Sequence, residues 1–287
     1  MNVPTIEEFL LAAPGSGEAP AAPQEEVVLF YPYAHDERGF HRVFLHTKVP
    51  TLTIYRPDRE NDRRTAFVVC PGGGYRGIVI DREGHAFGRY FQRRGYTVAV
   101  LKYRLPAPAW QDAAEQPAAL QDAMAAVRLL RSRAPDWDIN PGKIGILGCS
   151  AGGHLAGSAA MLWGKDLEAR PDFAALLYPV VCMHGSAAHA ESRENLLGPS
   201  PSPERAAAFS LELQARPGLP PFFIAHAKDD QTVSAENSRL LASALLAADV
   251  PVRIALYETG GHGFALGKGP PTDGWMPSFT QWLDELP

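Results

Sequence analysis

The sequence predicts the α/β fold class, with a mostly parallel central sheet, helices on both faces and an antiparallel N-terminal edge. Two observations support this. Continuous apolar runs, typical of strands buried on both faces, alternate with longer stretches of helical periodicity, and this alternation produces βαβ units. Loops rich in glycine or charge follow several of these runs. The chain has 287 residues, 46% of them hydrophobic and 21% charged, which is enough for a large core.

The predicted strands fall into two groups. Residues 26–33, 42–46 and 51–55 are expected to form the antiparallel edge. The buried parallel strands are expected at residues 66–70, 96–101, 143–147, 173–178, 221–226 and 252–257. Helices are expected at residues 82–94, 116–134, 151–161, 234–248 and 275–286.

The domain organisation follows from composition. Residues 1–26 are rich in Ala, Pro, Gly and Glu and predict a loosely ordered N-terminal arm. Residues 27–287 predict a single domain. Within it, residues 183–219 lose strand periodicity and gain Ser, Pro, Glu and Arg, with short helices expected at 192–197 and 203–209. We expect this insertion to shape a substrate pocket.

The composition argues against several classes of partner. The net charge is −5 and no basic stripe is present, so nucleic acid is not an expected partner. No stretch approaches the roughly 20 apolar residues of a membrane span. The first residues lack a cationic start and a long apolar run, which predicts no secretory signal and a cytoplasmic location. The three cysteines form no CxxC pair and are expected to be reduced fillers. The oligomeric state stays open.

The segment Gly148-Cys149-Ser150-Ala151-Gly152 lies between a predicted strand and a predicted helix. A strand that turns sharply into a helix through Gly-x-Ser-x-Gly is the nucleophile elbow of an α/β-hydrolase. The flanking glycines relieve crowding around a strained serine, here Ser150. The motif alone is a weak signal, because a glycine-rich turn before a tightly packed helix has the same sequence.

Three consecutive glycines follow the predicted strand at 66–70, in the loop Pro71-Gly72-Gly73-Gly74-Tyr75. One interpretation is an oxyanion loop, in which the N–H groups of Gly73 and Gly74 join that of Ala151. The other is a plain flexible turn. The position directly after a core strand favours the oxyanion loop.

An elbow serine needs a base and a carboxylate, in the chain order Ser, Asp, His, at the carboxyl ends of strands. Asp230 fits, with Asp229 as its adjacent rival; Asp230 is favoured because Val233 follows to hold the loop. His262, between glycines after the last predicted strand, fits the base. A solvated turn and a surface histidine are the alternative interpretations. No HExxH spacing occurs, so no metal and no cofactor is predicted.

Together these residues resemble the α/β-hydrolase esterases of the acetyl esterase/lipase, or acetyl-xylan-esterase-like, type. The resemblance extends from about residue 51 to the C-terminus and depends on residues 70–75, 83–84, 103–106, 121–123, 148–156, 226–233 and 260–264. It implies Ser150 as nucleophile, Asp230 as acid and His262 as base. It also implies oxyanion donors at Gly73, Gly74 and Ala151. Pro71 stands where this family commonly has histidine.

The expected function is therefore a serine esterase that hydrolyses short-chain carboxylic esters, acetyl esters above all, through an acyl-enzyme. The resemblance implies a small-molecule ester substrate, with acetylated saccharides as one class. An arylformamidase-like amidase or a lactonase would use the same triad. A non-catalytic binding protein on the same fold is the third alternative.

Overall fold

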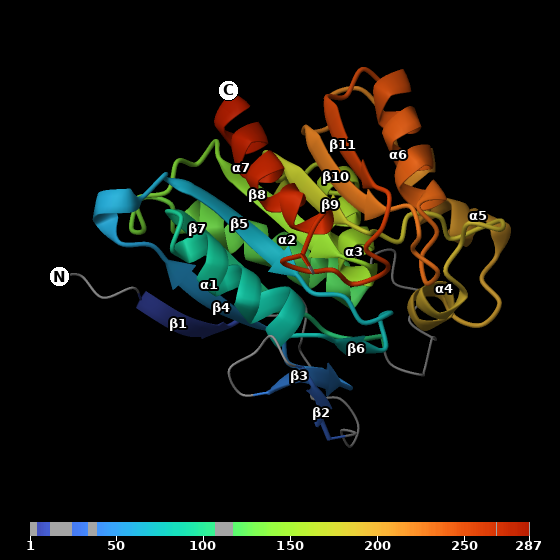
Figure 1. Ribbon diagram of the computed structural model, residues 1–287, viewed down its shortest axis with the longest axis horizontal. Coiled ribbons are helices and arrows are strands. Elements are labelled where there is room, and N and C mark those ends of the chain that lie inside the picture. The colour runs from blue at the N-terminus through green and yellow to red at the C-terminus, as the bar shows by residue number, and fades with distance from the viewer. Residues whose placement is uncertain (1–4, 12–24, 34–38, 107–116, 268, 287) are drawn as a thin grey trace.

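Figure 1 shows a computed structural model of the chain, which describes residues 5–11, 25–33, 39–106, 117–267 and 269–286. Among these residues, eight strands form a central sheet in the order β1-β4-β7-β5-β8-β9-β10-β11. Its strands are β1 (Thr5–Leu10), β4 (Thr51–Arg56), β5 (Thr65–Cys70), β7 (Tyr96–Lys102), β8 (Ile144–Cys149), β9 (Ala174–Leu177), β10 (Phe222–Ala227) and β11 (Val252–Tyr257). The six predicted parallel strands are confirmed as β5 and β7 to β11.

The strand order reverses between β5 and β8. Strand β5 pairs in parallel with β7 on one side and with β8 on the other. The loops that leave the carboxyl ends of two such strands diverge and open a crevice, where open α/β sheets bind ligands. The glycine-rich loop follows β5 and Ser150 follows β8, so both lie at this point. The sheet has the predicted α/β-hydrolase arrangement.

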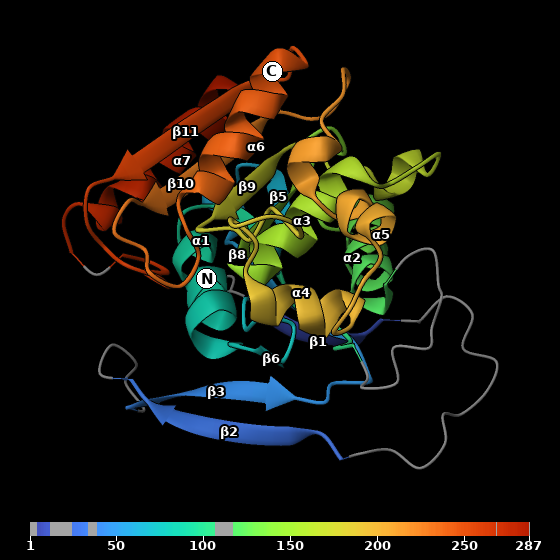
Figure 2. The same cartoon turned by 90° about the vertical axis from the view of Figure 1, so that its right-hand side faces the viewer.

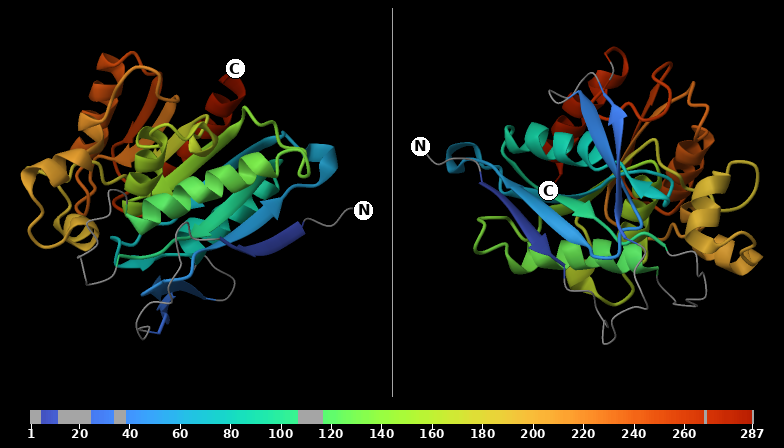
Figure 3. Two further views of the ribbon diagram at one scale, coloured as in Figure 1. Left: turned by 180° about the vertical axis from the view of Figure 1, so that it is seen from behind. Right: turned by 90° about the horizontal axis from the view of Figure 1, so that it is seen from below.

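Helices cover both faces of the sheet. They are α1 (Ala86–Gln92), α2 (Ala118–Ser132), α3 (Ala151–Met161), α6 (Glu236–Ala247) and α7 (Trp275–Glu285). Helices α1 and α7 lie on one face, and α2 and α3 lie on the other (Figures 1 and 3). Fully buried aromatic rings of Phe67, Phe91 and Phe279 join the first face to its helices, with centroids 5.3–6.0 Å apart. Short 3₁₀ turns are η1 (Arg59–Asn61), η3 (Leu167–Ala169), η4 (Leu211–Leu213) and η5 (Thr272–Gly274).

The predicted antiparallel N-terminal edge is confirmed, but its strands are not the three that were expected. Strand β3 (Phe40–Leu45) pairs with β2 (Val27–Pro32) on one side and with β6 (Gly77–Ile78) on the other, in a separate antiparallel sheet. Strands β2 and β3 are seen below the body in Figure 2. Of the three strands expected at the edge, only β4 is there. The physical reason is an ion pair outside the central sheet. The Arg42 guanidinium and backbone N–H bind the buried Asp81 carboxylate at 2.7–2.9 Å, which anchors β3 to the turn η2 (Asp81–His85).

Strand β1 takes the vacant edge position. It pairs antiparallel with β4, with Ile6 opposite Tyr55, and Glu7 forms an ion pair with Arg56 at 2.8 Å. Phe9 packs against Trp137 with ring centroids 5.7 Å apart. The prediction of a loosely ordered arm is therefore wrong for residues 5–10. Residues 1–4 and 12–24 of that range lie outside the described residues.

Two helices occur in the insertion at residues 183–219, where short helices are predicted: α4 (Ala190–Leu197) and α5 (Pro203–Ala208). Helix α4 lies against the glycine-rich loop, because Asn195 Nδ2 donates to the Gly74 carbonyl at 2.9 Å. All three cysteines are free and buried. None of the helices in the described ranges has the length and apolar character needed to cross a bilayer.

Candidate active site

Ser150 lies at the turn from β8 into α3. Its backbone has φ of 54° and ψ of −121°, a conformation that residues other than glycine rarely adopt. The glycines around it are required sterically. A Cβ on Gly148 would lie 2.0 Å from the Gly152 carbonyl oxygen, and one on Gly152 would lie 2.1 Å from that of Cys70. Backbone bonds hold the turn: Ser150 N–H donates to the Leu177 carbonyl at 2.9 Å.

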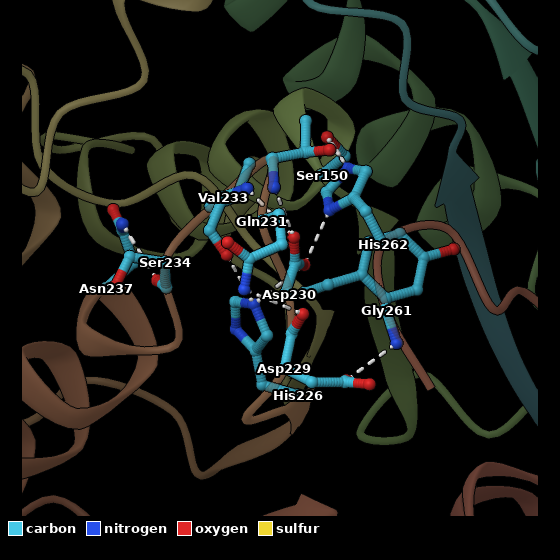
Figure 4. A network of polar contacts seen from close by, with 12 residues as sticks. Ser150, His226, Asp229, Asp230, Gln231, Val233, Ser234, Asn237, Gly261 and His262 are labelled. Atoms are coloured by element: carbon cyan, nitrogen blue, oxygen red, sulfur yellow. Dashed lines mark hydrogen bonds and ion pairs between the residues drawn. The ribbon is translucent and has the colours of Figure 1, made fainter. Parts of the chain in front are cut away.

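The structure brings Ser150, His262 and Asp230 together (Figure 4). His262 Nε2 lies 2.9 Å from Ser150 Oγ, and its Nδ1 lies 2.7 Å from Asp230 Oδ2. A carboxylate oxygen accepts, so Nδ1 carries the ring proton and Nε2 is the acceptor for the serine hydroxyl. This tautomer is the one that a general base needs.

Asp230 is held in place by its own loop. Its Oδ1 accepts the backbone N–H groups of Thr232 and Val233 at 2.8 and 2.9 Å. Burial raises the pKa of the Asp230 carboxyl, but hydrogen bonds from His226 and His262, the charge of His262 and the Val233 N–H outweigh burial. The pKa is therefore held below its usual range, and the side chain stays a carboxylate near neutral pH.

The adjacent carboxylate, Asp229, has different partners. Its side-chain oxygens accept the N–H groups of Gly260 and Gly261 at 3.2 and 2.8 Å, and the residue is exposed. Asp229 thus braces the loop that carries His262, while Asp230 contacts the imidazole itself. The two adjacent side chains therefore point in different directions, and of the two only Asp230 forms a hydrogen bond with His262.

His226 is a site residue that the sequence reasoning passed over. It is fully buried at the end of β10, and its Nε2 lies 3.1 Å from Asp230 Oδ2 and 3.0 Å from the Val233 carbonyl. Both partners are acceptors, so Nε2 is protonated, and Nδ1 accepts the Ser238 hydroxyl at 2.7 Å. Its place four residues before Asp230 is the only signal in the sequence.

The contact between His226 and Asp230 yields a prediction. His226→Ala should lower the free energy of unfolding at pH 7 by about 1.5–3 kcal/mol, because a buried carboxylate loses a donor. The hydrogen bond lowers the folded-state pKa of Asp230. Its contribution to the free energy of unfolding is therefore present above the unfolded pKa of about 3.9 and is lost as the pH falls through the folded pKa.

Urea unfolding at pH 7 and pH 3 measures the free energy of unfolding of the wild type and of His226→Ala. The difference between the two proteins should be smaller at pH 3 than at pH 7. The control Ser238→Ala keeps the Nε2 contact and should cost less; an equal cost would contradict this prediction.

The glycine-rich loop at residues 71–75 offers two backbone donors, the N–H groups of Gly73 and Gly74. Gly73 and Gly74 have positive φ of 133° and 64°, and a Cβ on Gly73 would lie 2.2 Å from the Gly77 carbonyl oxygen. The other polar groups are bonded: Gly72 N–H to Glu83, and the carbonyls of residues 71–74 to Tyr103 Oη, Val79 N–H, the N–H groups of Arg76 and Gly77, and Asn195 Nδ2. Within the described ranges, the N–H groups of Gly73 and Gly74 make no hydrogen bond. Ala151 N–H is the first of α3, which leaves it without a helical acceptor.

His154 lies one turn beyond Ser150 but outside the triad. It is buried, with Nδ1 2.8 Å from Tyr75 Oη and Nε2 2.7 Å from the Phe209 carbonyl. Burial lowers its pKa to about 4, against the hydrogen bond to Phe209. A neutral imidazole therefore joins helix α3 to the glycine-rich loop and to the insertion.

The strand order, and the strained serine at the turn from β8 into α3, define a protein of the α/β-hydrolase fold. Residues 52–245 match the BD-FAE family model. The chain is 34% identical over 236 residues to endo-1,4-β-xylanase B of Butyrivibrio fibrisolvens, covering 79% of this chain and 36% of that protein. It is 32% identical over 231 residues to an acetylxylan esterase of Xylanibacter ruminicola, covering 79% and 45%. The chain belongs to the BD-FAE family.

A solved structure shares the architecture. The acetyl ester-xyloside bifunctional hydrolase from Caldicellulosiruptor lactoaceticus superposes with a TM-score of 0.73 at 31% identity, covering 83% of this chain and 88% of that one. By contrast, the chain spans less than half the length of the two relatives found by sequence.

Proposed function

We propose that the protein hydrolyses short-chain carboxylic esters, acetyl esters above all, with Ser150, His262 and Asp230 as its catalytic triad. The observation that carries the proposal is the 2.9 Å contact between Ser150 Oγ and His262 Nε2, with the Asp230 carboxylate 2.7 Å behind the ring. These distances are within the reach of a nucleophile and its general base.

The reaction has two halves. His262 Nε2 takes the proton of Ser150 as Oγ attacks the ester carbonyl, and Asp230 stabilises the imidazolium. The oxyanion is bound by the N–H groups of Gly73, Gly74 and Ala151. The alcohol then leaves with the proton from the imidazolium, and an acyl-enzyme remains. Water, deprotonated by His262, repeats the attack and releases the carboxylic acid.

The acyl acceptor is proposed from the relatives. One protein similar to this chain is named an acetylxylan esterase, and another an acetyl ester-xyloside bifunctional hydrolase. We infer that this chain removes acetyl groups from xylose-containing saccharides. The insertion at residues 183–219 contacts the oxyanion loop through Asn195 and Gly74, which supports a role for it in shaping the acceptor site.

Labelling and a substrate panel test the proposal. A fluorophosphonate should modify Ser150, located by peptide mass spectrometry, because only an activated serine attacks phosphorus rapidly. With nitrophenyl acetate, butyrate and octanoate, kcat/KM should be highest for acetate, and acetylated xylo-oligosaccharides should release acetate. Faster turnover of a formanilide or a lactone would favour the amidase or lactonase alternative. Absence of both labelling and turnover would leave a binding protein.

A further inference from the structure

A second buried carboxylate, Glu83, lies beside the oxyanion loop and has no part in the triad. It is 2% exposed and belongs to a single π turn, η2 (Asp81–His85), at the start of α1. The wider turn is closed by His85 N–H donating to the Ile80 carbonyl at 2.8 Å. Such turns inside helices occur frequently at functional sites. A continuous α-helix was predicted over this region, so the π turn is a departure from the sequence expectation.

The carboxylate joins two loops of the candidate site. Glu83 Oε2 accepts Gly72 N–H at 2.9 Å, and Oε1 accepts the Tyr178 hydroxyl at 3.2 Å. The Tyr178 oxygen in turn accepts Ala265 N–H at 3.1 Å. A hydrogen-bonded chain thus extends from the oxyanion loop, through Glu83 and Tyr178, to the loop that carries His262.

Tyr178 also touches the base directly. Its ring packs edge-on against the His262 imidazole, with centroids 5.0 Å apart. Burial raises the pKa of Tyr178 well above its usual value, so the hydroxyl keeps its proton and donates it to Glu83. Arg82 Nη2 supplies a further donor to Glu83 at 3.3 Å, which offsets the cost of burying a carboxylate.

The space around Gly72 shows how closely these groups fit. A Cβ on Gly72 would lie 2.7 Å from Glu83 Oε2, 2.8 Å from the Cys149 carbonyl oxygen and 3.0 Å from Ser150 Cβ. The peptide of Gly72 is therefore confined between the carboxylate and the nucleophile. Because Glu83 holds this N–H, it sets the plane of the peptide that precedes the two unused donors. A run of three glycines has high backbone freedom, and this bond restricts it.

We propose that Glu83 is a positioning residue for catalysis, which fixes the oxyanion loop relative to the His262 loop through its bonds to Gly72 and Tyr178. It acts without touching the substrate. The inference rests on the proposed function, because it concerns the donors of the same site. Donors held in advance at the position of the oxyanion stabilise the transition state more than the bound ester.

Two variants test the role of Glu83. Glu83→Gln keeps an oxygen that can accept the Gly72 N–H. Its NH2 group would face the Tyr178 hydroxyl and the Arg82 guanidinium, which both donate to the carboxylate in the wild type. Tyr178→Phe keeps the ring and removes the hydroxyl. Both should lower kcat for nitrophenyl acetate by roughly 10- to 100-fold while KM changes less than about threefold, because removal of one oxyanion donor costs about 10²–10³. A boronic acid that forms a tetrahedral adduct should lose affinity in parallel with kcat.

The matched control is Asp122→Asn. Asp122 is likewise buried, at 1% exposure, and its carboxylate accepts a backbone N–H and a guanidinium, both of Arg104. Among the described residues, no hydrogen bond joins it to the triad or to the proposed oxyanion donors. It should lose stability without the selective loss of kcat. Circular dichroism and thermal unfolding establish that each variant folds; if Glu83→Gln does not, Tyr178→Phe alone decides.

The outcomes separate the two proposals. If the wild type is not labelled by a fluorophosphonate and turns over no ester, the proposed function fails. If the wild type is labelled and active but the folded variants keep kcat within about twofold, or Asp122→Asn loses as much kcat, the positioning role of Glu83 is refuted. A fall in kcat and boronate affinity that is absent from Asp122→Asn supports it.

Discussion

Ser150→Ala is expected to lower kcat for nitrophenyl acetate by about 10⁴- to 10⁶-fold, because no other group can form the acyl-enzyme. Initial rates at pH 7–8, corrected for spontaneous hydrolysis, measure the loss. His262→Ala should lose a similar amount. Since the two residues act as one unit, the double variant should be scarcely slower than either single variant.

The matched control for this change is Ser158→Ala. Ser158 lies in the same helix, α3, and is also buried, at 2% exposure. It lies two turns beyond the elbow, so its removal should leave kcat within about twofold of the wild type. If Ser150→Ala kept a tenth of the wild-type rate, the nucleophile would be another residue.

Asp230→Asn is expected to lower kcat by about 10⁴-fold, close to the loss measured when a triad carboxylate becomes an amide. The cause is the ring proton. An amide NH2 beside Nδ1 favours the tautomer with the proton on Nε2, and that nitrogen then cannot accept the proton of Ser150. The 2.7 Å contact between Nδ1 and the Asp230 carboxylate enforces the productive tautomer.

Asp229→Asn is the matched control, one residue away and with the same change of chemistry. Its side chain binds the N–H groups of Gly260 and Gly261, so the amide oxygen can replace one acceptor. Its kcat should stay within about tenfold of the wild type. Nearly equal losses from the two variants would show that the loop, and not the carboxylate on the imidazole, limits the rate.

Much of the fold can be predicted from sequence because the central strands are buried on both faces. Every residue of strand β5 is buried, so its sequence is a nearly continuous apolar run. A helix with only one buried face would instead alternate apolar and polar residues. Strands β2 and β3 lack this signal, because half-exposed strands look alike in either sheet. Strand β1 was missed because its six residues adjoin an Ala/Pro-rich stretch that dominates the local composition.

Some residues of the candidate site can be predicted from the sequence and others cannot. Ser150 and His262 can be found from the sequence because glycines mark the sharp turns that expose them. The choice between Asp229 and Asp230 could not be settled by spacing, since adjacency does not reveal which side chain faces the imidazole. The roles of His226 and Glu83 depend on partners 4 to 95 residues away in the chain, which only the packing of strands and loops brings close.

The bond from Asn195 to the Gly74 carbonyl has a consequence for protein engineering. One way to change the preferred alcohol part of the ester substrate is to exchange residues 183–219 between members of the family. In this chain that graft would also remove a hydrogen bond that holds the glycine-rich loop, whose N–H groups are proposed to bind the oxyanion. Chimeras that keep an amide side chain at position 195 should therefore retain kcat. Chimeras without it should have a lower kcat even where their substrate selectivity has changed.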